Sequence, residues 1–421
     1  MELRYNLNDR LKAKELLLYS MQWFVLAVAV VITSLFIAVG SPAERVLYAQ
    51  KVFALTGVAT IVQVLWGHRM PIVVGPASVL LVGIITAMAT QGDALNTNKI
   101  YTSVLIGGVA ITLLTVSRVL EHVQRIFTPR IVMVILMLIA FTLSTTIKNL
   151  IFPASEPERY AFGLWFTLLG LPLMALAAVK LRGVAKSLLV PVSLGVGCVI
   201  YYMVYGGFWD VVSRYGHAEG ALLLPKLEFD GSMIVAFLFC YVALLINDIG
   251  SIQSLGGILQ ADQLQKRCRR GVGVTGVFNV VAGAFGVIGP VNYSMSPGVI
   301  ASSSCASRYA LLPAGLGLVV CALVPDFIAV LSAIPNTVIG VILFYLMGTQ
   351  LAAAFAMMTS SGKAIGFEDC LIIGLPIMAA LIFGIIPMHV IPSILRPILG
   401  NGFVMGVILV ILLEHVIIRR K

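Results

Sequence analysis

The sequence predicts an all-α membrane protein with about fourteen transmembrane segments, arranged as two inverted halves of seven spans each. Three observations lead to this fold class. The composition is strongly apolar, apolar runs near twenty residues long recur along the whole chain, and a Gly-Pro motif occurs twice about half a chain apart.

The composition is that of a chain surrounded by lipid. Of the 421 residues, 60% are hydrophobic and 11% are charged, and the mean hydropathy is +1.03. A water-soluble domain of this size would need far more charge to cover its surface. The N-terminal stretch "MELRYNLNDRLKAKE" is polar and precedes a first span that we expect to be retained, so no cleaved signal peptide is predicted.

Other functional classes find little support in the residues. The six cysteines form no CxxC pair, and the five histidines lie in loops or near span ends, so we expect no metal site and no disulfide. There is no P-loop for an ATP-driven pump. We also find no nucleophile–base pattern and no separate soluble domain, so we expect neither an enzyme nor a bound cofactor.

Apolar runs bounded by charge, glycine and proline define the predicted spans. Each is long enough to cross roughly 30 Å of hydrocarbon as a helix. The spans centre on 16–38, 46–66, 71–90, 101–119, 131–150, 160–179, 188–206, 233–256, 271–288, 290–306, 309–331, 335–357, 370–388 and 398–418.

Positive charge orients these spans. With the N-terminus inside, 20 of the 28 Lys and Arg residues fall on the cytoplasmic side and 8 on the outer side. This asymmetry predicts both termini in the cytoplasm of a bacterial or archaeal cell, with the chain in its inner or plasma membrane. The run "KRCRR" at 266–270 then serves as an orientation signal in a short loop, and we expect no nucleic-acid partner.

The Gly-Pro motif reads "VVGPAS" at 73–78 and "VIGPVN" at 287–292, and Gly75 and Gly289 are 214 positions apart. Seven spans per half is an odd number, so the second copy must be inverted relative to the first. Proline and glycine interrupt a helix, and irregular backbone at membrane depth persists only where protein or a cavity surrounds it. Such mirrored interruptions indicate the binding site of a transporter, with short extended segments paired and helix N-termini aimed at a ligand; the alternative is a pair of proline kinks, which are common in membrane helices.

Polar residues inside the predicted spans extend this candidate site. Asn247 and Asp248 lie in the eighth span, where an acid costs about 2.5–3.5 kcal/mol on insertion scales and is a functional candidate for that reason. The alternative is that the helix breaks at Gly250 and leaves Asp248 near a wet edge or bonded to backbone N–H groups. Gln22 is the only amide of the first span and either contributes to the site or bonds a neighbouring helix. Tyr293 either stacks on a planar ligand or anchors packing.

On these residues the chain resembles the nucleobase–cation symporter-2 family, also called the nucleobase–ascorbate transporter family of xanthine and uracil permeases. The similarity covers nearly the whole length. It includes the glutamine of the first span, the interrupted third span and "NDIG" in the eighth. It continues through "GPVNYSMSPGV" in the tenth span and "IPSILRPILGNGFVMGVILVILLEH" near the C-terminus.

The resemblance implies a division of the fourteen spans into a core domain and a gate domain, with short antiparallel strands in spans three and ten. The core would comprise residues 1–130 (spans one to four) and 233–334 (spans eight to eleven). The gate would comprise residues 131–232 (spans five to seven) and 335–421 (spans twelve to fourteen). It further implies a homodimer that moves uracil, xanthine, urate or related bases, often with protons, by an elevator-like motion of the core.

The chain departs from the family pattern at several of these positions. Asn247 stands where many members have a glutamate that bonds the base, and Ser251 stands where histidine is frequent. A second acid expected near Ser294 or Met295 is missing, and Trp23 replaces a frequent histidine. An amide pairs with a base through one donor and one acceptor but takes up no proton, so coupling would move to Asp248 or be lost.

Our first hypothesis is therefore a proton-linked permease for a nucleobase, with Asp248 as the proton carrier. The second is a transporter of a small anion on the same scaffold, because two facing helix N-termini attract anions. The predicted substrate-binding residues are Gln22, Ala77, Ser78, Asn247, Ser251, Asn292, Tyr293, Ser294 and Met295.

Overall fold

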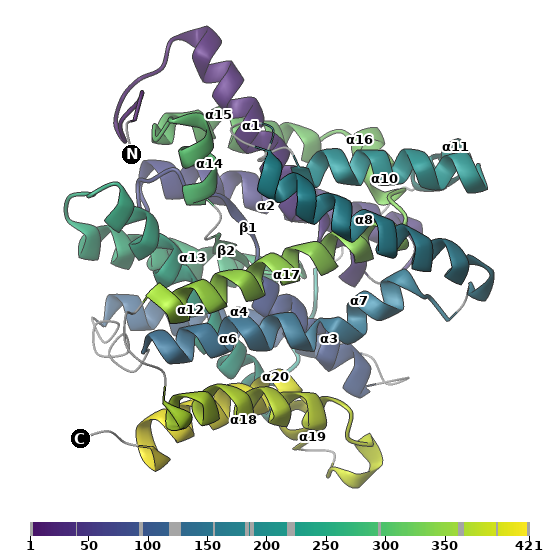
Figure 1. The fold of residues 1–421 in the computed structure, drawn as a ribbon, viewed down its shortest axis with the longest axis vertical. Coiled ribbons are helices and arrows are strands. Elements are labelled where there is room, and N and C mark those ends of the chain that lie inside the picture. The colour runs from purple at the N-terminus through teal and green to yellow at the C-terminus, as the bar shows by residue number, and fades with distance from the viewer. Residues whose placement is uncertain are drawn as a thin grey trace.

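A computed structural model of the protein describes residues 3–38, 40–91, 96–117, 128–154, 156–181, 185, 189–216, 224–293, 296–360, 366–392 and 395–418. These residues are mainly helical (Figure 1). The first half contains α1 (Ala13–Ile32), η1 (Leu35–Ile37), α2 (Pro42–Leu65), β1 (Val74–Pro76), α3 (Ser78–Gln91), α4 (Thr97–Val116), α6 (Pro129–Thr142), α7 (Ser144–Ile151), η3 (Pro157–Arg159), α8 (Tyr160–Lys180), α10 (Leu189–Tyr205) and α11 (Phe208–Gly216). The second half contains α12 (Gly231–Ile258), α13 (Leu264–Phe285), β2 (Pro290–Asn292), α14 (Ser296–Ser303), η4 (Arg308–Ala310), α15 (Leu311–Ala322), α16 (Pro325–Ser332), α17 (Asn336–Ser360), α18 (Phe367–Gly384), η5 (Met388–Val390), α19 (Arg396–Leu399), α20 (Gly402–Leu412) and the π-helical turn η7 (Leu413–Ile417).

Many of these helices are long and apolar enough to cross a membrane. Within the described residues, seven helices meet that criterion, or up to nine if each of two sharply bent pairs is one span. Shorter apolar helices occur at Ser78–Met88, Asn336–Ala352 and Gly402–Ile417. The chain is therefore a mainly helical multi-pass membrane protein, and the count of fourteen spans stays a prediction.

The two halves of the chain are intertwined, because helices of the first half pack along helices of the second. α4 lies along α13, and α2 lies along α15, so each pair joins one helix of the first half to one of the second. Glycine permits this close approach: a Cβ on Gly57 would lie 2.6 Å from the carbonyl oxygen of Gly315, and one on Gly283 would overlap the backbone nitrogen of Leu105. Both crossings thus depend on backbone-to-backbone contact.

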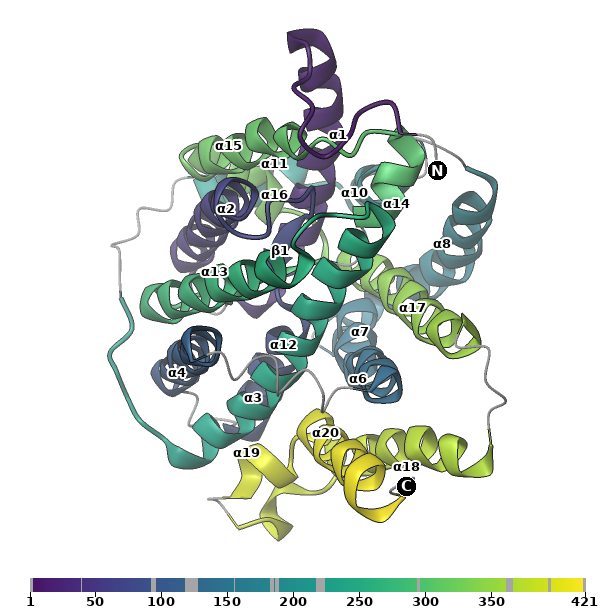
Figure 2. The same ribbon diagram turned by 90° about the vertical axis from the view of Figure 1, so that its left-hand side faces the viewer.

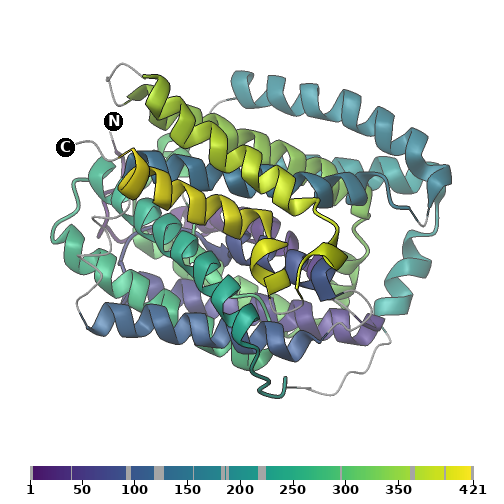
Figure 3. The same ribbon diagram turned by 90° about the horizontal axis from the view of Figure 1, so that it is seen from below.

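Several other long helices form a second group. α6 packs against α17 and α18, α18 packs against α20, and α17 also contacts α8 and α10. Figure 2 shows α2, α4, α13 and α15 on one side of the molecule and α6, α7, α8 and α17 on the other. The C-terminal helices of this second group, α18, α19 and α20, lie below the other helices and nearest the viewer in Figure 3.

The two Gly-Pro segments meet near the centre of the molecule, where β1 and β2 pair (Figures 1 and 2). The strands are antiparallel, with Val74 opposite Asn292, Gly75 opposite Val291 and Pro76 opposite Pro290. The predicted pairing of these two segments is confirmed, whereas their numbering as the third and tenth spans stays a prediction. α3 begins two residues after Pro76, and α14 begins four residues after Asn292.

α12 runs without a break past the polar pair of the eighth predicted span. Its N-cap residue Asp230 accepts a hydrogen bond from the backbone N–H of Met233 at 3.2 Å, and the helix continues for 28 residues. Gly250 is therefore helical. The break that would place Asp248 at a wet edge does not occur, and Asp248 is fully buried.

Candidate functional site

The candidate site surrounds the paired strands, which we describe as a β1 arm (residues 73–78) and a β2 arm (residues 287–293). Hydrogen bonds extend the pairing beyond the strands at both ends. The Ala77 N–H donates to the Gly289 carbonyl at 2.9 Å, and the Tyr293 N–H donates to the Val73 carbonyl at 2.8 Å. The N–H of Ala77, one of the predicted substrate-binding residues, therefore joins the two arms.

Asp248 on α12 holds the β2 arm from one side. Its Oδ1 accepts hydrogen bonds from the backbone N–H of Asn292 at 3.0 Å and from the side-chain amide of Asn292 at 2.8 Å. Its Oδ2 is buried and accepts no hydrogen bond of ordinary length from the described residues. Both residues are completely buried. Two charge-assisted bonds to one oxygen fix the geometry of the arm and leave the second oxygen with spare acceptor capacity.

His68 holds the same asparagine from the other side. The N–H of Met70 donates to His68 Nδ1 at 3.0 Å, so the ring proton belongs on Nε2, which lies 3.1 Å from Asn292 Oδ1 and donates to it. A continuous chain of bonds therefore runs from Met70 through His68 and Asn292 to Asp248. This chain uses both ends of the Asn292 amide and fixes its orientation.

The loop that carries His68 is itself tied to α13. Arg267 donates to the carbonyl oxygens of His68 at 3.2 Å and Arg69 at 3.1 Å, and to the carboxylate of Asp262 at 2.5 Å. The hydrogen bond and positive charge of Arg267 lower the pKa of Asp262, which lies in the exposed loop before α13. Gln63, at the end of α2, donates to Thr275 Oγ1 at 3.1 Å and to the Gly271 carbonyl at 2.9 Å.

Asn279 on α13 supports the proline of the β2 arm. Its amide nitrogen donates to the carbonyls of Thr275 at 2.8 Å and Pro290 at 2.9 Å, and its Oδ1 lies 2.8 Å from the hydroxyl of Tyr241. Asn279 is fully buried. Because proline has no N–H, its carbonyl is the one backbone group of that residue that needs a partner, and Asn279 supplies it.

The β1 arm is held differently. The Tyr293 hydroxyl donates to the Pro76 carbonyl at 2.5 Å and lies 3.4 Å from Ser78 Oγ. Its ring lies against Gly75, where an added Cβ would be 3.0 Å from Tyr293 Cε2. Ser296 receives the Val73 N–H at 3.0 Å. Both side chains that hold this arm therefore come from the second half of the chain.

Comparison with known proteins identifies the family. The sequence profile described as "Permease family" matches residues 14–393. The chain belongs to this permease family. It is the xanthine and uracil permease family that the sequence resembles.

Two curated relatives and one solved structure extend the comparison. The permease is 24% identical to "Putative purine permease YwdJ" of Bacillus subtilis, over 97% of each chain. It is 23% identical to "Uric acid permease PucJ" of Bacillus subtilis, over 76% of this chain and 73% of the relative. Its fold is similar to the transmembrane domain of a cyanobacterial bicarbonate transporter, BicA, with a TM-score of 0.64, 16% identity and coverage of 88% of this chain and 96% of the other. The permease is thus an integral membrane transporter with this fold.

The other predicted binding residues of the permease are in different situations. Ser251 is buried, and its hydroxyl donates to the Asn247 carbonyl of its own helix at 2.8 Å. The Asn247 side chain is half-buried and makes no hydrogen bond with the described residues. Gln22 is buried and has a polar interaction partner. Ser294 and Met295 lie outside the described residues.

Four residues that hold the two arms were not predicted from the sequence: His68, Thr275, Asn279 and Ser296. His68 was assigned to a loop or span end, yet it is completely buried. Asn279 offered a usable signal, because an amide inside the apolar run "TGVFNVVAG" needs a partner in the membrane. Nothing in the sequence indicates that its partner is the carbonyl of Pro290.

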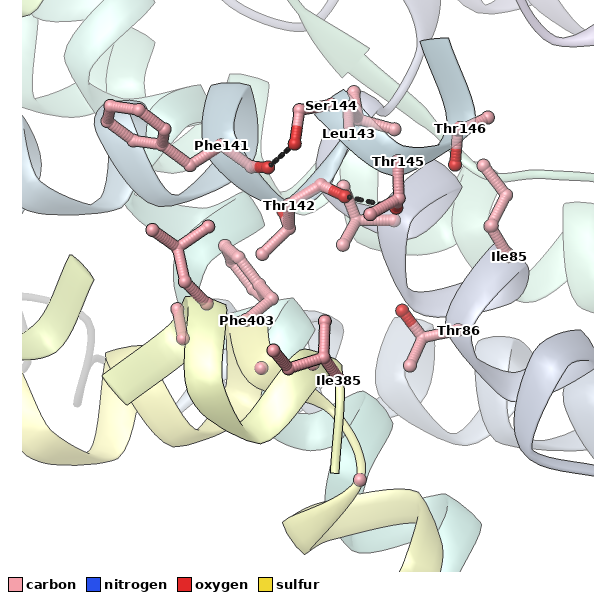
Figure 4. Close-up of a pocket in the computed structure, with 16 residues that line it drawn as sticks. Ile85, Thr86, Phe141, Thr142, Leu143, Ser144, Thr145, Thr146, Ile385 and Phe403 are labelled. Atoms are coloured by element: carbon pink, nitrogen blue, oxygen red, sulfur yellow. Dashed lines mark hydrogen bonds between the residues drawn. The ribbon is translucent and has the colours of Figure 1, made fainter. Parts of the chain in front are cut away.

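A separate small cavity of about 140 Å³ lies next to α3 (Figure 4). Its walls come from α3, the α6–α7 junction, α18, α20 and the turns that flank those last two helices, and none of the predicted binding residues lines it. The hydroxyls of Ser144 and Thr145 donate to the carbonyls of Phe141 and Thr142, so they satisfy their own helix (Figure 4). The described part of the chain also contains no cluster of three or more His, Cys, Asp or Glu residues able to hold a metal ion.

Proposed function

We propose that this permease is a secondary-active transporter of a nucleobase, a purine such as xanthine or urate, or uracil, that binds at the junction of the two arms. The observation that supports the proposal most strongly is the antiparallel pairing of β1 with β2, each followed by the N-terminus of a helix. The positive ends of the α3 and α14 dipoles favour partial negative charge, such as the carbonyl oxygens of an oxopurine. The names of the purine and uric acid permeases among its relatives support the same substrate class.

Within this site, we assign hydrogen bonding to the base edge to Asn247, with Gln22 and Ser78 as further polar contacts. Asn247 supports this role because its half-buried amide makes no bond with the described residues and keeps both donor and acceptor available. Asn292 contributes differently. Its side chain is bound at both ends, by His68 and Asp248, so it positions the arm on which Tyr293 stands. Ser251, Ser294 and Met295 complete the proposed surroundings.

Proton coupling is the role we propose for Asp248. A proton added at Oδ2 would remove the charge that holds the N–H and side chain of Asn292, while leaving Oδ1 a weaker acceptor. The β2 arm and the start of α14 would then be held less firmly. Protonation would in this way change the geometry of the substrate site without a proton on the substrate itself.

The transport motion we propose is an elevator movement of a core domain against a gate domain, in a homodimer of fourteen-span subunits with cytoplasmic termini. The two helix groups seen in Figure 2 support such a division, since the crossed pairs α4–α13 and α2–α15 bind the core halves together. The candidate span on α8 is only 11% buried and that on α18 only 22% buried. These apolar faces suit contact with lipid and with a second subunit.

The decisive experiment is uptake of labelled xanthine, urate, uracil, bicarbonate and sulfate by cells that lack their own carriers and express this protein. Saturable uptake of one or more bases is expected. Uptake of bicarbonate or sulfate alone would overturn the proposal and support the second hypothesis, an anion transporter. The similarity to a bicarbonate transporter does not support that hypothesis by itself, because at 16% identity it shows the fold alone.

Coupling is tested separately with Asp248→Asn. The amide oxygen can still accept both bonds from Asn292, so the variant is expected to fold and to bind the base. Uptake should lose its stimulation by external acid. Unchanged pH dependence in a folded variant would remove Asp248 from the coupling role and leave nucleobase transport intact.

A further inference from the structure

A cavity of about 580 Å³ lies outside the candidate site, at one end of the molecule. Its lining residues come from η1, the start of α2, the end of α7, η3, α10, α11, the end of α16 and the start of α17, and from the turns beside them. Figure 1 shows α10, α11 and α16 close together in this part of the molecule. Arg45, Arg159 and Arg214 all line it, and the charge distribution of the sequence predicts that they face outside.

The backbone bends sharply to form this cavity. α10 and α11 meet at an angle of 108°, at two glycines with left-handed backbone, Gly206 at φ +67° and Gly207 at φ +73°. Consecutive left-handed residues are accessible to glycine at little cost. The bend folds α11 back against α16 and places Asp210 and Arg214 on the cavity wall.

Aromatic rings make up one wall. Tyr201, Tyr202 and Tyr205 of α10 line the cavity, and the Tyr202 hydroxyl donates to the Ala333 carbonyl at 2.5 Å. The Arg159 guanidinium lies 5.1 Å from the ring centroid of Tyr205 and 5.7 Å from that of Tyr201. The wall thus already stacks a flat, delocalised group against flat rings.

The arginines that line the cavity differ in their interaction partners. Arg159 is paired with Glu156 at 2.6 Å and also donates to the Tyr201 hydroxyl. Arg45 and Arg214 are exposed, and neither takes part in an ion pair with a described residue. With Asp210 and Glu156 as the acids of the lining, the three arginines leave it with net positive charge.

We infer that this outer cavity, which we call the vestibule, binds planar heteroaromatic anions such as urate before they reach the junction of the arms. The aromatic wall selects a flat ring, and Arg45 and Arg214 provide charge for an anion and donors for its oxygens. The vestibule is large enough for a bicyclic base. Its role as an entry site depends on the proposed function, whereas binding of a planar anion there does not.

The test compares two bases of similar shape and different charge. Urate carries a negative charge at neutral pH, and hypoxanthine is neutral. In the Arg45→Gln/Arg214→Gln double variant, the KM for urate is expected to rise about tenfold and its dependence on ionic strength to weaken, because electrostatic attraction at the entrance is lost. The KM for hypoxanthine and the kcat for both should change less than twofold.

Lys226→Gln is the matched control. Lys226 is exposed, is predicted to lie on the outer side of the membrane and does not line the vestibule. The variant therefore removes a positive charge from the outer side without changing the vestibule. An equal rise in the urate KM in Lys226→Gln, an equal effect on hypoxanthine, or no change in the double variant would overturn the inference. Tyr205→Leu should raise the KM for both urate and hypoxanthine, because it removes part of the aromatic wall. An unchanged KM for both bases would contradict a role of that wall in binding.

A binding measurement separates the two proposals. The Kd of urate is measured with purified wild-type protein and with the double variant, by thermal shift at increasing urate concentration. Uptake of bases with no difference in Kd or KM between the two proteins would overturn the vestibule and leave the proposed function standing. Absence of any base uptake, together with urate binding that the double variant weakens about tenfold, would overturn the proposed function and leave the vestibule.

Discussion

The β1 arm and the β2 arm share a backbone geometry but are held by different forces. The β2 arm is bound by buried polar side chains of α12, α13 and the loop after α2, namely Asp248, Asn279 and His68. The β1 arm is bound by main-chain bonds to its partner and by the hydroxyls of Tyr293 and Ser296. The two arms therefore share a backbone arrangement without sharing side-chain chemistry.

This difference has a functional meaning. An ionisable group that is linked to one arm alone can change that arm while the other stays fixed. Among the described residues, the carboxylate of Asp248 bonds the β2 arm and makes no hydrogen bond with the β1 arm, and Thr275 of α13 is its other polar neighbour. Protonation of Asp248 would therefore loosen the β2 arm and leave the β1 arm unchanged. The variants below compare how much each arm contributes to stability.

The largest effect is expected for Asn292→Ala. The change leaves the Asp248 charge and the His68 Nε2–H without their shared partner in the interior. Removing one partner of a buried, hydrogen-bonded charge costs about 3–5 kcal/mol. Thermal unfolding of the purified protein should show a large loss of stability. Ser78→Ala on the β1 arm is the control, with an expected change within about 0.5 kcal/mol, and equal losses would mean that the arms are supported alike.

The next-largest effects are expected when the two motif glycines, Gly289 and Gly75, are replaced by alanine. A Cβ on Gly289 would overlap the buried amide of Asn279, which also holds Pro290, whereas one on Gly75 would overlap Val30 Cγ1. Overpacking costs about 1–3 kcal/mol, and we expect Gly289→Ala at the upper end and Gly75→Ala at the lower.

Second-site variants sharpen this comparison. Val30→Ala should restore much of the stability lost in Gly75→Ala, because it removes the methyl group that the new Cβ meets. Asn279→Ala should not restore Gly289→Ala, because it also removes the bond to the Pro290 carbonyl. Rescue of both variants, measured by thermal unfolding, would show that Asn279 only fills space.

The pairing of the arms was predictable from sequence because Gly-Pro is a local signal with a direct effect on the backbone. The partners of the β2 arm were not. Asn247 and Asp248 are neighbours on a helix, about 100° apart around its axis, so only one can face the strand, and the sequence does not say which. The structure turns Asp248 toward Asn292.

The role of His68 and the path of α10 depended on packing in three dimensions. His68 lies close to charged residues in the sequence and becomes buried only because α13 covers its loop through Arg267. The sharp bend at Gly206 and Gly207, where the predicted span 188–206 ends, joins α10 to α11 at 108°, and length and hydropathy do not predict that angle. Two adjacent glycines were the visible signal.

A smaller effect is expected for Tyr293→Phe. The variant keeps the ring over Gly75 and loses the hydroxyl that joins the arms through the Pro76 carbonyl, for a cost of about 1 kcal/mol. Thermal unfolding measures this cost. In uptake assays the KM for the base should stay near wild type if the ring alone contacts the substrate, and Tyr293→Leu should then raise it. A Phe variant as impaired as the Leu variant would assign the contact to the hydroxyl instead.

The smallest effect on stability is expected for Ser251→Ala. Its hydroxyl donates to the Asn247 carbonyl one turn earlier in α12, a carbonyl that the helix itself can satisfy, so stability should change by less than about 0.5 kcal/mol. The same variant reports on the neighbouring Asn247. If the hydroxyl only bonds its own helix, the KM for the base also stays unchanged. A raised KM with unaltered thermal unfolding would instead show that this hydroxyl turns toward the substrate when the site is occupied, and would extend the polar part of the site from the β2 arm along α12.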